Sequence, residues 1–242
     1  MFVRIVVIGT LDTEELFSMG EIEYIRNAVM DVDGNLYDAV CINGKTWLAS
    51  NLRTTRFSDG EKIGRYANSK LGKLPYFEYP YGCERNPNKL RKCGLHYNFE
   101  AVNTGVLAPK GWRVSSIEDW TELLTFLGKS DIYNIVDGEM RPYLAATAKS
   151  LCIGETWRKS DVENSVGCRV CENNVTGFGM YPNGRSLDIK KQTGYVSYIW
   201  CSDVYPGSDE YTWMIRTWYK DIHIVGAFCA RAFGLGVRCV KC

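Results

Sequence analysis

The sequence predicts an α+β fold in which short strands and long loops outnumber helices, and three observations support this. Aromatic residues make up 13% of the 242-residue chain and glycine occurs 23 times, a composition typical of folds rich in turns. Residues 36–49 have the pattern of a β-hairpin, and residues 117–127 have that of an amphipathic helix. With 45% hydrophobic and 24% charged residues, the chain is a packed globular protein and disorder is excluded as its main state.

The net charge of the chain limits the kinds of binding partner that the sequence favours. The 29 Lys and Arg residues against 28 Asp and Glu residues give a net charge of +1, so no broad electrostatic argument favours nucleic acid or an anionic membrane. No apolar run approaches the ~20 residues that span a bilayer, so we expect no membrane insertion. Only His96 and His223 are present, which disfavours histidine-based metal sites and serine–histidine relays.

Residues 1–30 are expected to form an N-terminal lead-in made of a strand and a short helix. The strand is predicted at Val3–Ile8, and Thr13–Met30 is compatible with a helix because apolar residues recur at helical spacing. Arg4 interrupts the apolar run and acidic residues follow at once, so the segment lacks the pattern of a signal peptide.

A hairpin follows this lead-in. The cluster Asp31–Asn35 predicts a tight turn, because the later acidic ligands of a calcium loop are missing. Residues 36–42 alternate as a strand, Asn43-Gly44 is a two-residue turn signal, and residues 45–49 return.

The rest of the chain predicts loops, two helices and short strands. Residues 51–98 are rich in Gly, Asn, Tyr and Pro and predict a long ordered loop. The helix at 117–127 has Ser115 or Ser116 as its cap and ends at Gly128, and a second helix is expected over Met140–Ser150. From Cys152 to the end we expect short strands and turns.

The ten cysteines allow two interpretations. Cys168 and Cys171 form a C-x-x-C pair that could join Cys83 and Cys93 in a four-thiolate zinc site. The favoured alternative is free thiols or local disulfides, since nine residues separate Cys83 from Cys93 and cysteine is often simply buried. Ten cysteines also suggest an oxidising destination.

Six groups of residues, taken in order, resemble one known family. They lie at 33–37, 42–52, 95–102, 107–116, 174–178 with 182–185, and 236–241. Together they resemble the Fibrobacter succinogenes major paralogous domain over residues 31–242. The chain departs from the family pattern at 199–203, at 230–236 and in the basic loop between Cys83 and Cys93.

This resemblance implies a C-type-lectin-like fold, with two helices, small twisted antiparallel sheets and long ordered loops that carry a binding surface. The same architecture is similar to formylglycine-generating enzymes and to the variable proteins of diversity-generating retroelements, whose variable residues lie near the C-terminus. The mixed run 219–229 resembles such a variable segment.

The predicted contact surface lies within residues 195–231, where rings and polar groups alternate. Tyr and Trp combine large contact area with a polar tip, as binding surfaces require. The candidates are Tyr198, Trp200, Ser202, Asp203, Tyr205, Tyr211, Trp213, Arg216, Tyr219, Asp221, His223 and Phe228. Core packing is the alternative for every ring, and for Trp200, Trp213 and Trp218 it is the stronger interpretation.

The sequence therefore predicts a non-catalytic receptor-binding or adhesion module, with no cofactor and no metal. Its expected partner is a protein or glycan receptor on a cell surface, its expected location is a virion or a bacterial surface, and homo-oligomer formation is left open. The alternative is an enzyme of the formylglycine-generating type that uses a reactive cysteine. Cys201 lies in no basic or helix-N-terminal sequence context that would activate it.

Overall fold

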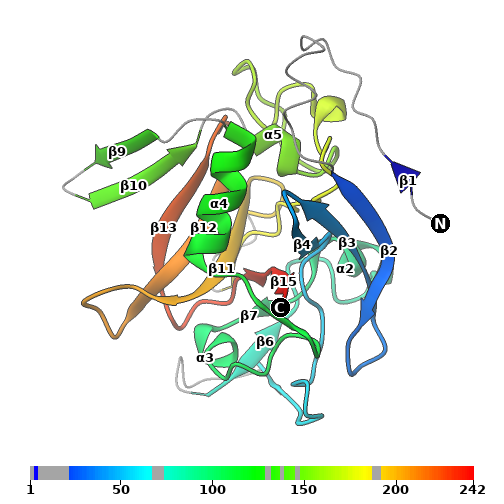
Figure 1. Ribbon diagram of the computed structural model, residues 1–242. Coiled ribbons are helices and arrows are strands. Elements are labelled where there is room, and N and C mark those ends of the chain that lie inside the picture. Colours follow the sequence, from blue (N-terminus) through cyan, green and yellow to red (C-terminus); the bar gives the residue numbers. More distant parts are fainter. Residues whose placement is uncertain are drawn as a thin grey trace.

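The computed structural model describes residues 3–4, 22–66, 74–128, 132–136, 139–144, 148–186 and 192–242. Two six-stranded sheets and one three-stranded sheet lie in this part of the chain (Figure 1). The mixture of helices with mostly antiparallel sheets confirms an α+β fold.

The first sheet has the strand order β1-β2-β3-β4-β15-β8. Its strands are β1 (Val3–Arg4), β2 (Glu23–Met30), β3 (Leu36–Ile42), β4 (Lys45–Leu48), β15 (Cys239–Lys241) and β8 (Trp112–Val114). The hairpin predicted over 36–49 is confirmed, because β3 and β4 pair antiparallel around Asn43-Gly44. The C-terminal strand β15 lies in the middle of this sheet, where Val240 is opposite Trp47 of β4 and Arg113 of β8.

The predicted lead-in helix is wrong where the structure describes it. Residues 23–30 form β2, which pairs antiparallel with β3 and with β1. Ile25 and Val29 both pack on the core, and a spacing of four residues suits one face of a strand as well as one face of a helix. The predicted strand at Val3–Ile8 is confirmed for Val3 and Arg4, and residues 5–21 lie outside the described residues.

The second sheet has the order β14-β11-β12-β13-β10-β9. Its strands are β14 (Gly236–Val237), β11 (Val196–Val204), β12 (Tyr211–Trp218), β13 (Ile224–Ala230), β10 (Glu139–Leu144) and β9 (Ile132–Val136). Strands β11, β12 and β13 are seven to nine residues long, longer than the short strands expected here. The hairpin β9–β10 joins this sheet only at the end of β10, so most of it projects from the molecule (Figure 1).

The second predicted helix, over 140–150, is also wrong for most of its length. Residues 139–144 form strand β10, and only α5 (Ala148–Leu151) is helical. Pro142 lies inside the predicted helix, where it lacks the N–H that a helix interior requires.

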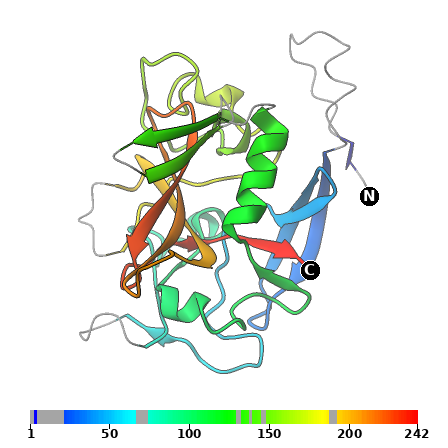
Figure 2. The same cartoon turned by 60° about the vertical axis from the view of Figure 1, so that its left-hand side comes forward.

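Helix α4 (Ile117–Gly128) confirms the other predicted helix and joins the two large sheets. Trp120, Leu123 and Leu124 are buried in one cluster with Trp47 of the first sheet and Ile215 of the second. In Figure 2 the helix lies between the β11–β13 strands and the β2–β4 strands. Ser116 caps it, since its Oγ accepts a hydrogen bond from the N–H of Asp119 at 3.1 Å.

Residues 51–98, predicted as one ordered loop, also contain short elements. The third sheet has the order β5 (Gly64–Arg65), β6 (Tyr76–Glu78) and β7 (His96–Tyr97), and α2 (Pro87–Cys93) precedes β7. Helix α3 (Phe99–Val102) follows directly, and the 3-10 turn η1 (Val170–Glu172) lies in the later loop region. None of the described helices is long and apolar enough to cross a membrane.

Candidate ligand-binding surface

Four of the predicted aromatic residues form one cluster at the end of the second sheet where β11 turns into β12. Trp213 of β12 and Phe228 of β13 are directly opposite in register, so their side chains lie on the same face. Tyr205, from the β11–β12 turn, has its ring 5.0 Å from that of Trp213 and 5.1 Å from that of Phe228. Tyr211 packs edge-on against Phe228 at 5.6 Å, which completes a cluster that we call the ring cluster.

The ring cluster reaches solvent. Tyr211 is 39% exposed, and Tyr205, Trp213 and Phe228 are half-buried. Tilted and edge-to-face contacts at these distances are favourable, so the rings hold one another in place while each keeps part of its surface in solvent. Trp213 also packs against the buried cluster that contains Trp47 and Trp120. The arrangement therefore presents preordered aromatic edges together with the two phenols of Tyr205 and Tyr211.

The loop beside the ring cluster is fixed by its own hydrogen bonds. Ser208 Oγ accepts from the backbone N–H groups of Glu210 and Tyr211, both at 3.2 Å. The N–H of Arg231 donates to the carbonyl of Glu210 at 3.0 Å. The turn that carries Tyr205 is thus tied to the end of β13.

Tyr219, Asp221 and His223 lie in a separate place, at the other end of β12. The eight residues of β12 place its ends about 23 Å apart. The ring of Tyr219 is 5.7 Å from that of Trp218, which is 46% exposed, and the interpretation of Trp218 as core is therefore wrong. Asp221 Oδ2 accepts from the N–H of Trp218 at 2.8 Å, and burial raises the pKa of Asp221, partly offset by that bond and by Arg216 and His223.

Tyr198 and Arg216 face the opposite side of the sheet from Trp213. They are directly opposite each other in register, and Tyr198 packs on the cluster that contains Trp200 and Met214. Side chains alternate along a strand, so Arg216 cannot share a face with Trp213. These two residues do not contribute to the ring cluster.

Trp200 is a correction to the predicted surface. Its side chain is wholly buried, its Nε1 donates to the carbonyl of Tyr97 at 2.7 Å, and its ring packs edge-on against Phe99 at 5.7 Å. A ligand on the surface cannot reach it, so Trp200 belongs to the core.

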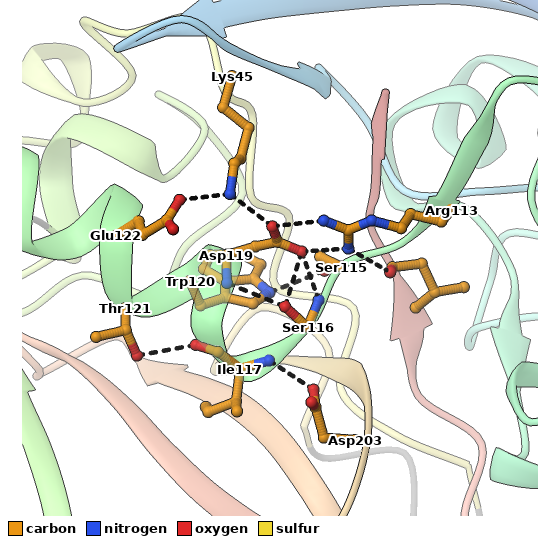
Figure 3. Close-up of polar contacts among 11 residues, drawn as sticks. Lys45, Arg113, Ser115, Ser116, Ile117, Asp119, Trp120, Thr121, Glu122 and Asp203 are labelled. Carbon is orange, nitrogen blue, oxygen red and sulfur yellow. Dashed lines mark hydrogen bonds and ion pairs between the residues drawn. The ribbon is translucent and has the colours of Figure 1, made fainter. Parts of the chain in front are cut away.

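Asp203 and Ser202 are anchored to the start of α4. Asp203 Oδ2 accepts from the backbone N–H of Ile117 at 2.6 Å (Figure 3). At this end of the helix a negative charge also interacts favourably with the helix dipole. Ser202 is exposed, and its N–H donates to the carbonyl of Ser115 at 2.9 Å. Asp203 therefore positions α4 against β11.

Asp119 is the centre of a polar network on the same helix terminus (Figure 3). Its carboxylate accepts from both guanidinium Nη atoms of Arg113, from Lys45 Nζ at 2.7 Å and from the N–H of Ser116 at 2.7 Å. Burial alone would raise the pKa of Asp119, but these hydrogen bonds outweigh it and hold the pKa well below its ordinary value. A carboxylate so fully engaged serves the capping of α4 and is unsuited to accept a proton in catalysis.

The cysteines do not form the four-thiolate site. Among the residues that the structure describes, no three His, Cys, Asp or Glu side chains lie where they could hold one metal ion, so the zinc hypothesis is wrong. Cys83 and Cys93 are buried against each other, whereas Cys168 is half-buried and Cys171 exposed. Burial raises the pKa of Cys201 well above its ordinary value, which leaves it a neutral thiol.

Two cavities in the described part of the chain lie away from every predicted site residue, and the sequence offered no signal for either. The larger, about 910 Å³, is an open groove between β2–β3 and the 174–179 loop, with Arg26, Arg53 and Asp38 in its lining. The smaller, about 400 Å³, is lined by residues that include Lys89 of α2 and Tyr181. No residue of the ring cluster lines either of these two cavities.

The fold and the ring cluster define a mixed α+β scaffold that carries an aromatic surface patch at one sheet end. Residues 40–241 match the sequence model of the Fibrobacter succinogenes major domain, and the chain belongs to this family. The match extends from within β3 to the last residue of β15. It covers the second and third sheets, and it leaves β1, β2 and the start of β3 in the first sheet outside. No curated protein and no solved structure matches the chain.

Proposed function

We propose that this chain is a non-catalytic ligand-binding module, and that the ring cluster is its contact surface. The observation that carries the proposal is the ordered, partial exposure of Tyr205, Tyr211, Trp213 and Phe228, four rings that hold one another while part of each stays in solvent. Such rings give large contact area at low cost in side-chain entropy, and tyrosine and tryptophan dominate the energetics of protein interfaces. The partner is a protein or glycan receptor on a cell surface.

The finer parts of the proposal come from the family resemblance. The scaffold is C-type-lectin-like, the chain acts on a virion or a bacterial surface, and the segment around 219–229 is diversified by a retroelement. Phe228 lies in that segment and in the ring cluster, which supports a variable contact residue there. A near-copy of the coding region upstream of the gene would support diversification, and a locus with no such copy would contradict it.

Binding is tested with a glycan array and a surface-protein display library, followed by titration of each hit with variants. Tyr211→Ala removes the most exposed ring of the ring cluster and should weaken binding at least tenfold, about 1.4 kcal/mol. Trp218→Ala is the matched control, because it removes an exposed ring at the other end of β12. Equal affinity of the Tyr211→Ala variant, or loss only in the Trp218→Ala variant, would contradict the proposal.

The enzyme alternative makes a different prediction about cysteine reactivity. A catalytic cysteine is an accessible thiolate, so it reacts with iodoacetamide much faster than the other thiols. From exposure we expect Cys171 and Cys242 to be labelled first at neutral pH, and the buried Cys201 to remain unlabelled. Rapid labelling of Cys201 in the folded protein would favour the enzyme.

A further inference from the structure

The loop before α2 and the end of α2 bring two cysteine sulfurs into contact. Cys83 and Cys93 are both wholly buried, and they form a small apolar cluster with Tyr181, against which Leu90 and Ile153 pack. Their Sγ atoms are 2.7 Å apart. Unbonded carbon atoms pack at about 3.5–4.0 Å, and bonded cysteine sulfurs lie about 2.05 Å apart, so this contact is closer than packing alone produces.

Contacts that do not involve sulfur hold Cys83 in place. Its N–H donates to the carbonyl of Pro80 at 3.0 Å, and its carbonyl accepts from the N–H of Asn86 at 3.1 Å. Asn86 in turn caps α2 through the N–H of Lys89 at 3.0 Å. Cys83 is therefore fixed in the turn that starts the helix.

Cys93 is held equally firmly at the other end of α2. Gly94 follows it with a φ of +69°, and a Cβ on Gly94 would lie 2.5 Å from Cβ of Asn51 and 2.7 Å from the carbonyl of Leu52. The N–H of Gly94 donates to the carbonyl of Leu90 at 2.9 Å. The backbone after Cys93 therefore packs closely on residues 51–52. Both cysteines are thus held in positions where their sulfurs stay in contact.

We propose that Cys83 and Cys93 form an intramolecular disulfide when the protein folds in an oxidising compartment. A metal does not account for the contact, because no third His, Cys, Asp or Glu ligand joins the pair among the described residues. The inference is independent of the ligand-binding proposal, because it concerns covalent closure of the 83–93 segment.

The bond forms by thiol–disulfide exchange with a small-molecule or protein disulfide. One cysteine thiolate of the pair attacks the oxidant's disulfide, which yields a mixed disulfide and releases one thiolate. The second cysteine thiolate then attacks the cysteine sulfur of the mixed disulfide and releases the other thiolate. Overall, the two cysteine thiols are oxidised and the oxidant's disulfide is reduced to two thiols. Because both cysteines are buried in the folded chain, the exchange takes place before residues 83–93 have folded.

The bond would fix one wall of the smaller cavity. Asn86, Lys89 and Lys92 line this cavity from α2 and its cap, and Tyr181 of the cysteine cluster lines it as well. Lys89 Nζ also donates to the carbonyl of Tyr81 at 3.3 Å, so the loop and the helix act as one unit. Closing the 83–93 segment covalently makes this wall permanent.

The experiment refolds the full chain in a buffer of reduced and oxidised glutathione, blocks free thiols with iodoacetamide in denaturant, and maps peptides by mass spectrometry. We expect a linked peptide pair that contains Cys83 and Cys93, lighter than the two reduced peptides by two hydrogen atoms and separated by reduction. Alkylation of both cysteines after refolding, or a link from either one to a different cysteine, would overturn the proposal. This map needs no variant, so a folding defect in a mutant does not affect it.

A second readout uses matched variants. The urea midpoint of the refolded wild type should fall when dithiothreitol is added, and the Cys83→Ser/Cys93→Ser variant should show no such shift. The Cys168→Ser/Cys171→Ser variant should keep the shift, because these residues lie outside the buried pair. A shift that follows the Cys168/Cys171 pair instead would show that the proposed bond is not the one that forms.

Discussion

A buried histidine makes the stability of this protein depend on pH between neutral and mildly acidic conditions. His96 of β7 is 2% exposed; burial lowers its pKa to about 3, and hydrogen bonds with the backbone of Asn183 and Gly184 offset part of that shift. The ordinary pKa of histidine is about 6.5. Between these two values the unfolded chain binds a proton that the folded chain does not.

The sign and size of the effect follow from this difference in bound protons. The contribution of His96 to the free energy of unfolding is fully present above pH 6.5 and decreases as the pH falls below it. The loss is about 1.4 kcal/mol at pH 5.5 and about 2 kcal/mol at pH 5.0, relative to pH 7.5. The carboxyl of Asp119, with its lowered pKa, contributes only at more acidic pH, so the two effects do not overlap.

The assay is urea unfolding followed by tryptophan fluorescence at pH 7.5, 6.5, 5.5 and 5.0, in the presence of a fixed concentration of reductant. His96→Gln removes the titrating group and should flatten the dependence on pH, whatever it does to the absolute stability. The reasoning is refuted if the His96→Gln variant keeps the wild-type slope.

The remaining predictions concern the cap of α4 and the close approach at Gly94. Asp119→Asn should lower the free energy of unfolding by about 2 kcal/mol at neutral pH, because a 2%-exposed carboxylate loses its charge while its partly exposed cationic partners remain. In the same urea assay Glu122→Gln, at a 54%-exposed partner of the same network, should change stability by less than about 0.5 kcal/mol. Gly94→Ala should cost about 3 kcal/mol or more, because a Cβ there meets backbone and has nowhere to move. Gly105→Ala, at a φ of +73° with open space around it, should cost only about 1 kcal/mol by thermal unfolding, and equal losses in the two glycine variants would contradict the steric argument.

Local signals in the sequence predicted the elements that depend on local chemistry. The Asn43-Gly44 turn and the capped helix after Ser116 formed as expected, because turn residues and caps act over a few neighbours. The start of α2 carries a comparable signal, although the prediction for residues 51–98 was one long loop. Asn86 precedes Pro87 and accepts from the N–H of Lys89, which is the pattern of a helix N-terminus.

The predictions from sequence were wrong where one spacing of apolar residues fits both a helix and a strand. They were also wrong where pairing between segments far apart in the sequence determines the structure. The four-residue spacing of Ile25 and Val29 fits a helix and a strand alike, and pairing with β3 decided for the strand. The composition of 195–231 showed that this segment holds many aromatic residues. It could not show that Trp200 packs under Phe99, or that Tyr211 and Tyr219 lie at opposite ends of one strand, since both depend on pairing between distant segments.

The position of β15 has a consequence for synthesis of the chain. During translation β4 and β8 are completed long before Cys239–Lys241 leave the ribosome, and until then each offers an unpaired edge to any neighbouring chain. Arg238, which donates to the carbonyls of Leu48 and Phe178 at 2.7 and 2.6 Å, arrives equally late. We therefore expect the nascent protein to need protection by chaperones until residues 238–241 are made, and a polypeptide truncated before residue 238 to aggregate.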